Sequence, residues 1–80
     1  TAVHRYGRGA AVIATTKRVT EILTEYGLTL PCDPRWIVAA HLCEYGQDTE
    51  PSIRTVMQSC RLCAKRTHED NEALARSYGL

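Results

Sequence analysis

Residues 32–46 read CDPRWIVAAHLCEYG, and this segment predicts one helix with a defined start and end. Asp33 can accept hydrogen bonds from the free amides of a first turn, and Pro34 suits the first helical position. Gly46 follows the segment, and glycine is favoured just past a helix because that position takes a left-handed backbone. We therefore expect a helix from Pro34 to Tyr45. Because it is apolar on nearly every side, it should lie at the centre of the fold or in an interface.

Three further helices are predicted from apolar residues at helical spacing and from start and stop signals. A proline indicates the start of one, a capping-box pattern over residues 67–70 indicates the start of another, and glycines end two of them. No run alternates apolar and polar residues at strand period beyond a few positions. The sequence therefore predicts an all-α fold, a small bundle of three to four short helices. The expected bounds of the other helices are Val12 or Thr15 to Tyr26, Pro51 to Lys65 or Arg66, and about Thr67 to Gly79.

The chain has 80 residues, enough for one hydrophobic core and no more. We expect a single domain over residues 1–80, with residues 1–11 as a flexible lead-in. The 44% hydrophobic and 24% charged residues argue against a disordered tail or a low-complexity linker. No apolar run approaches the roughly 20 residues of a membrane-spanning helix, so we expect a soluble domain with no membrane contact, and an intracellular location is favoured. The start at Thr1 without a leader favours a domain cut or processed from a longer polypeptide.

The charges are distributed unevenly, although the net charge is only +1. Residues 1–18 and residues 51–66 each carry four basic residues and no acidic one. A helix that exposes long basic or amide side chains on one face can reach both phosphates and base edges in a major groove. We therefore predict nucleic-acid binding by the third helix, with supporting phosphate contacts from Lys17 and Arg18. The predicted contact residues of the third helix recur at helical spacing and are Arg54, Gln58, Arg61 and Lys65.

The start of the third helix resembles a known DNA-binding motif. A helix and a polar turn are followed by PSIRTVM, residues 51–57, with a small polar residue, a β-branched core residue and an arginine. This order resembles the way in which helix-turn-helix regulators enter their recognition helix. The span from Gly46 to Ile53 is longer than in the compact motif. The resemblance supports the prediction of a small non-enzymatic binding module that contacts nucleic acid through its third helix, with DNA binding as one form, and the choice between DNA and RNA stays open.

Two other interpretations stay open. In the first, the third helix packs its apolar stripe inward and simply exposes its basic residues to water. In the second, the chain is a protein–protein interaction or assembly domain of a larger polypeptide, with self-association as one form. Trp36 would then be the anchor, because buried aromatic residues dominate interface energetics. The predicted inward stripe of the third helix consists of Ile53, Val56, Met57, Cys60 and Ala64.

The four cysteines allow three chemical states. Cys60-x-x-Cys63 has zinc-ligand spacing, and His68, Cys43, His41 and Cys32 could complete a site. Alternatively, disulfides from Cys43 to Cys60 and from Cys32 to Cys63 would join the second helix to the third. We favour buried thiols, because cysteine is among the most often buried residues, and we predict no metal and no cofactor. Whether the cysteines are free, disulfide-bonded or metal-bound stays open.

We do not expect an enzyme. Cysteine and histidine are both present, but no stretch supplies a glycine-rich turn or paired carboxylates. A helical bundle of this length also offers little room for a substrate cleft. His4, His41 and His68 are scattered along the chain, so we expect each at the surface or at a helix cap.

Overall fold

The computed structural model describes the backbone of residues 2–80 and the side chains of residues 9–80. The described residues form helices and no strand, which confirms the all-α prediction. No helix in this part of the chain is both long enough and apolar enough to cross a membrane. The helices are α1 (Ala2–Glu25), α2 (Pro34–Tyr45), α3 (Ile53–Lys65) and α4 (His68–Ser77).

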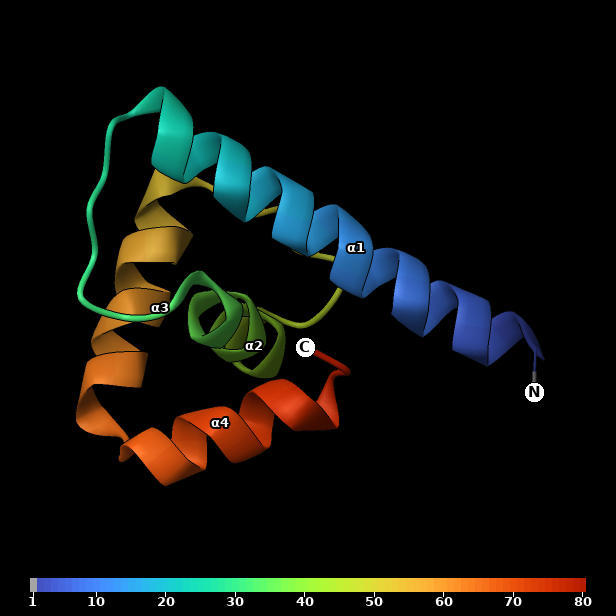
Figure 1. The fold of residues 1–80 in the computed structure, drawn as a ribbon. Helices are drawn as coiled ribbons and strands as arrows, with labels where there is room; N and C mark the ends of the chain where they lie inside the picture. The colour runs from blue at the N-terminus through green and yellow to red at the C-terminus, as the bar shows by residue number, and fades with distance from the viewer. Residues whose placement is uncertain (1) are drawn as a thin grey trace.

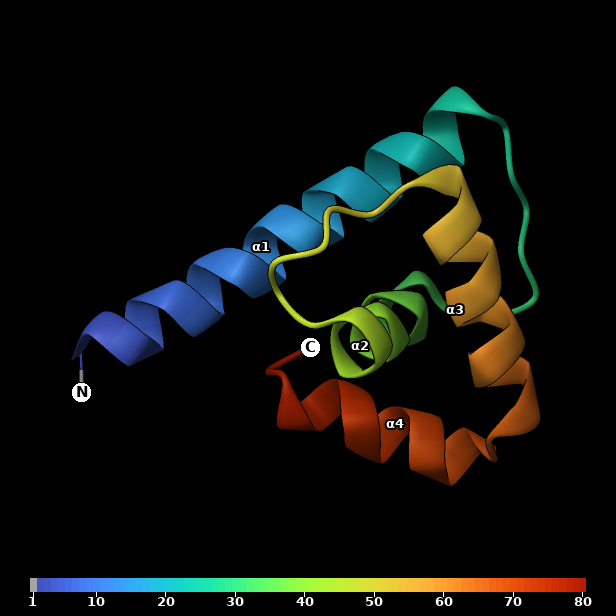
Figure 2. The ribbon, with the colours of Figure 1, turned by 180° about the vertical axis from the view of Figure 1, so that it is seen from behind.

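Helix α2 lies at the centre of the bundle, as its apolar sequence predicted. Figure 1 shows α2 nearly end-on, with α1 above it, α3 beside it and α4 below it, and Figure 2 shows the same arrangement from behind. Residues 37–42 of α2 are all buried. Burying one Val, Ile or Leu side chain stabilises a fold by about 1.5–3 kcal/mol, so each outer helix gains most by packing on α2. The outer helices contribute Val19, Ile22, Val56, Cys60 and Cys63 to the core cluster.

The predicted bounds of α2 and the predicted start of α4 are confirmed by their caps. The Asp33 carboxylate accepts a hydrogen bond from the N–H of Arg35 at 2.9 Å, and Gly46 takes a left-handed φ of 78°. At the start of α4, the Thr67 hydroxyl accepts a hydrogen bond from the N–H of Asp70 at 3.1 Å. These signals could be predicted because each one acts on backbone groups that helix geometry leaves free.

Helix α3 begins at Ile53, two residues after the predicted start at Pro51. Ser52 is the N-cap: its hydroxyl accepts a hydrogen bond from the N–H of Thr55 at 3.3 Å. In return, the Thr55 hydroxyl accepts a hydrogen bond from the N–H of Ser52 at 2.8 Å. This capping box satisfies two amides together, which a start at Pro51 would not do. The connection from α2 therefore covers residues 46–52, longer than the tight turn of a helix-turn-helix motif.

Helix α1 begins at Ala2, well before the predicted start at Val12 or Thr15. Its N-terminal part extends past the other helices in Figures 1 and 2. A segment that faces no core needs no apolar periodicity, and periodicity was the basis of the predicted start. The alanines at positions 10, 11 and 14 favour a helix by intrinsic propensity instead. Whether residues 1–11 are flexible stays a prediction, and the side chain of His4 lies outside the described residues.

The buried face of α3 differs from the predicted apolar stripe. Val56 and Cys60 are buried as expected, but Ile53 is 41% exposed and Met57 is 39% exposed. Ser59 and Cys63 are buried in their place. Ser59 can be buried because its hydroxyl donates a hydrogen bond to the carbonyl of Thr55 at 2.8 Å. At about 100° per residue, the buried face is turned by roughly 60° from the predicted one.

His41 is fully buried, so its predicted place at the surface or at a cap is wrong. Its ring lies against the ring of Tyr45, with 5.1 Å between the centroids. Neither ring nitrogen has a hydrogen-bond partner. Burial lowers the pKa of His41 below its ordinary value. The prediction failed because the apolar neighbours of His41 in α2 carry it into the core. His68 is exposed, as expected.

Candidate nucleic-acid interface

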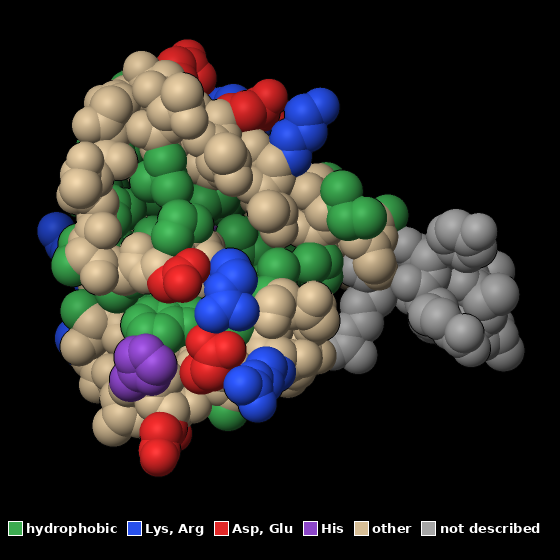
Figure 3. Space-filling view, viewed as in Figure 1, with side chains coloured by type: hydrophobic (Ala, Val, Ile, Leu, Met, Phe, Trp, Pro, Cys, Tyr) green, Lys and Arg blue, Asp and Glu red, His purple; other side chains and the backbone are tan. Residues whose placement is uncertain are grey.

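The predicted contact residues of α3 lie opposite its buried face. At about 100° per residue, their mean direction is about 180° from that of the buried residues of the helix. All of them are exposed, and blue side chains project at the left edge of Figure 3, where Figure 1 places α3. The structure therefore brings these side chains together on one outer surface. This surface, the α3 basic face, consists of Arg54, Gln58, Arg61 and Lys65.

Acidic groups do not neutralise the α3 basic face. Among the described residues, no ion pair or side-chain hydrogen bond engages Arg54, Arg61 or Lys65. By contrast, Arg35 and Arg76 are paired with an acid: Glu72 lies 2.8 Å from a nitrogen of Arg35 and 3.5 Å from a nitrogen of Arg76. Free positive charge therefore gathers on α3, where it can meet an external anion.

A hollow of about 450 Å³ adjoins the α3 basic face, between α3 and the end of α2. Guanidinium groups in its wall can bind phosphate, and an aromatic ring and a thioether offer contact to a base or an apolar side chain. One carboxylate in the wall opposes anion binding at its own edge. The lining residues are Glu44, Tyr45, Arg54, Met57, Gln58 and Arg61.

Sequence reasoning missed Glu44, Tyr45 and Met57 as part of this site. Met57 was assigned to the core because its apolar spacing from Ile53 is helical. Its neighbours Arg54, Gln58 and Arg61 were the only signal that it could be exposed. No sequence signal places Glu44 and Tyr45 beside α3, because that depends on how α2 packs against α3.

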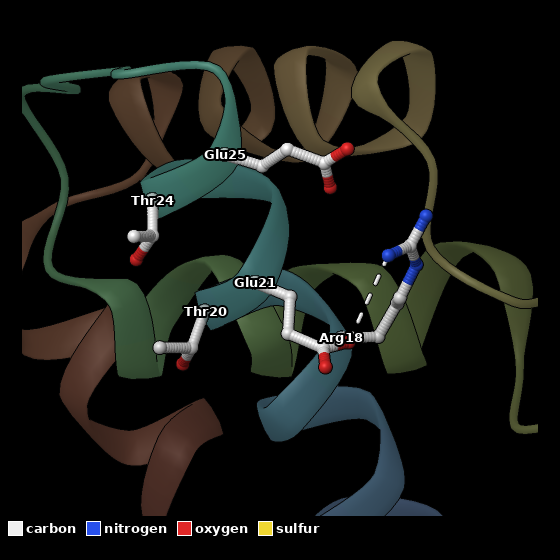
Figure 4. A pocket seen from close by; sticks show the side chains of 5 residues that line it. All are labelled: Arg18, Thr20, Glu21, Thr24 and Glu25. Atoms are coloured by element: carbon white, nitrogen blue, oxygen red, sulfur yellow. Dashed lines mark ion pairs between the residues drawn. The ribbon is translucent and has the colours of Figure 1, made fainter.

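The two predicted supporting residues lie on α1. Lys17 is exposed, whereas Arg18 forms ion pairs at 3.7 Å with Glu21 and with Glu50. Figure 4 shows the ion pair to Glu21, beside a hollow of about 420 Å³. One helix alone lines this hollow, so it does not enclose a ligand. Arg18 thus joins α1 to the connection before α3, and its charge is already matched by acids. The hollow is lined by Arg18, Thr20, Glu21, Thr24 and Glu25.

Trp36, the predicted anchor for a partner, is half-buried against α4. Its Nε1 donates a hydrogen bond to Oε1 of Glu72 at 3.1 Å. Its ring meets the ring of His68 edge-on, with 4.7 Å between the centroids. The structure therefore gives Trp36 a role inside the chain, where it joins α2 to α4.

Three of the cysteines, Cys32, Cys60 and Cys63, lie together in the core, and Cys43 is exposed. All four are free, so the alternative pairings of Cys43 with Cys60 and of Cys32 with Cys63 are not formed. The favoured interpretation of buried thiols is confirmed for three of the cysteines and is wrong for Cys43. Within the described part of the chain, no three His, Cys, Asp or Glu side chains are placed to hold a metal. The zinc-ligand spacing of Cys60 and Cys63 therefore does not assemble a site there.

Comparison with known protein families, curated proteins and solved structures found no match for this chain. The fold and the site define its class as a small all-α bundle with a basic outer helix.

Proposed function

We propose that this chain is a non-enzymatic module that contacts nucleic acid through the α3 basic face. The observation that carries the proposal is the unpaired positive charge on α3, where Arg54, Arg61 and Lys65 have no acidic partner among the described residues. Unpaired charges on an exposed surface cost little free energy in water. When they bind phosphates, the release of counterions from the nucleic acid adds to the affinity.

The shape of α3 supports the same function. The helix has 13 residues and is therefore about 20 Å long, and its side chains opposite the core are exposed. A helix of this width fits the major groove, where arginine and lysine bind phosphates and an amide such as Gln58 can pair with a base edge. The adjoining hollow beside Tyr45 can take an unpaired base.

The test is a fluorescence-anisotropy titration with random-sequence duplexes and single strands of DNA and RNA at two salt concentrations. If the three basic residues each neutralise one phosphate, the affinity for duplex DNA should fall about 40-fold between 50 and 200 mM salt. A variant with Arg54→Ala, Arg61→Ala and Lys65→Ala should lose the binding and its salt dependence.

A control is needed to show whether binding depends on the position of the positive charges on α3 or only on the net charge of the protein. The triple variant changes the net charge from +1 to −2. A variant with Thr20→Glu, Thr29→Glu and Gln47→Glu reaches the same net charge at exposed positions outside α3. Binding that is retained in this control and lost in the α3 variant supports the proposal. Absence of binding at low salt, or equal loss in both variants, contradicts it.

A protein partner is the alternative function, and one observation favours it. Ile53 and Met57 are exposed beside the basic residues of α3, so this surface also offers apolar contact. Here we expect Met57→Asp to abolish partner binding, whereas the charge variant would only weaken it.

A further inference from the structure

The cluster of three buried thiols is independent of the α3 basic face and has no part in the proposed function. Its members come from two separate segments: Cys32 lies in the connection before α2, and Cys60 and Cys63 lie one turn apart on α3. The thiol of Cys32 donates a hydrogen bond to the carbonyl oxygen of Cys60, with 3.6 Å between sulfur and oxygen. The chain thus holds the Cys32 thiol against the backbone of Cys60, 28 positions further along the sequence.

From this contact we propose that Cys32 and Cys60 form an intramolecular disulfide when the protein meets a peroxide-class oxidant. A carbonyl oxygen lies about 2.4 Å from its own Cα, so the sulfur of Cys32 is at most about 6 Å from the Cα of Cys60. Cys32 belongs to a non-helical connection, so no helical geometry at Cys32 opposes the adjustment that a disulfide requires.

Cys60 is a better partner than Cys63 for two reasons. Cys60 is 7% exposed and Cys32 is 9% exposed, whereas Cys63 is only 1% exposed and is shielded from an oxidant. Burial, with a further contribution from Cys32, raises the pKa of Cys63 to about 12, so its reactive thiolate is scarce at neutral pH. Burial and Cys32 also raise the pKa of Cys60, which predicts slow oxidation that speeds up at alkaline pH.

The reaction balances with hydrogen peroxide as the oxidant. Hydrogen peroxide first transfers one oxygen atom to one thiol, which becomes a sulfenic acid. Its other oxygen atom leaves as water. The second thiol then attacks the sulfenic sulfur, the S–S bond forms and a second water leaves. The two thiols together lose two hydrogen atoms, and one peroxide becomes two waters.

The disulfide can be mapped directly in the 80-residue chain, because Arg61 separates Cys60 from Cys63. The reduced protein is treated with hydrogen peroxide, its remaining thiols are alkylated, and it is digested with trypsin and analysed by mass spectrometry. We expect a linked pair of the peptides 19–35 and 55–61. We also expect the melting temperature to rise by roughly 10 °C and to return after reduction, since the bond closes a long loop.

Variants sharpen the assignment. Cys60→Ala should abolish the linked peptides, whereas Cys63→Ala and the surface control Cys43→Ser should keep them. The wild-type map decides the proposal even if a core variant fails to fold. Complete alkylation of Cys32 and Cys60 after oxidation would overturn it. So would a disulfide that joins Cys32 to peptide 62–65, or one that involves only Cys43.

Discussion

His41 shows most clearly how a single side chain can conflict with its surroundings. It is fully buried, and neither of its ring nitrogens has a hydrogen-bond partner. A buried polar group without a partner typically costs about 1–3 kcal/mol, and a buried charge costs more. The neutral imidazole is therefore tolerated beside Tyr45, whereas the imidazolium is not.

This environment predicts that the fold loses stability in mild acid. Burial lowers the pKa of His41 in the folded state, whereas the unfolded chain keeps a value near 6.5. Below that value the unfolded state binds more protons, so stability is complete above about pH 6.5 and falls as the pH drops toward the folded pKa.

The free energy of unfolding, measured with urea at pH 7 and pH 5, should fall more for the wild type than for His41→Leu. The variant should be as stable as the wild type or up to about 1 kcal/mol more stable at pH 7. Identical pH dependence of the two proteins would contradict this explanation.

At the scale of the element, α3 depends on the capping box between Ser52 and Thr55. The two reciprocal hydrogen bonds satisfy amides that the helix itself cannot use. They also fix where the helix begins.

We therefore expect Ser52→Ala to destabilise the protein by about 1 kcal/mol. Ser52→Asp should retain most of the stability, because its carboxylate can accept the same hydrogen bond from Thr55. The measurement is urea unfolding followed by circular dichroism, with Thr29→Ala in an exposed connection as the neutral control. If Ser52→Ala behaves like this control, the cap does not contribute to stability.

At the scale of the whole molecule, a polar network joins α2, α4 and the C-terminal residue. Glu72 accepts hydrogen bonds from Nε1 of Trp36 at 3.1 Å and from Arg35 at 2.8 Å. Arg35 also donates to the carbonyl oxygen of Leu80 at 3.3 Å. This network holds α4 against α2. It adds to a contact for which α4 supplies few apolar residues.

The hydrogen bond from Trp36, followed by Arg35 and Arg76, lowers the pKa of Glu72. Its contribution to stability is therefore complete above the unfolded pKa near 4.3 and is lost as the pH falls through the lower folded value. Glu72→Gln should lower the melting temperature at pH 7 and change the tryptophan fluorescence. Glu69→Gln, on the exposed side of α4, should do neither. Equal melting temperatures for both variants would exclude a stabilising role of the network.

The sequence predicted much of the fold and part of the site. Helical spacing alone was enough to place Arg54, Gln58, Arg61 and Lys65 on one surface. The exposure of Met57 and the approach of Tyr45 could not be predicted, because both depend on the angle at which α3 packs on α2. His41 was misassigned for a different reason, because its apolar neighbours in α2 carry it into the core.

The bounds of α2, the start of α4 and the central place of α2 were thus determined by sequence alone, since caps, glycines and apolar composition act within a turn or two of the chain. Only the tertiary structure decided which face of α3 is buried and which arginines are left unpaired. It also brought Cys32 to Cys60. These features depend on contacts between segments that are far apart in the sequence. Such contacts form together when the core packs, so they cannot be read from one residue at a time.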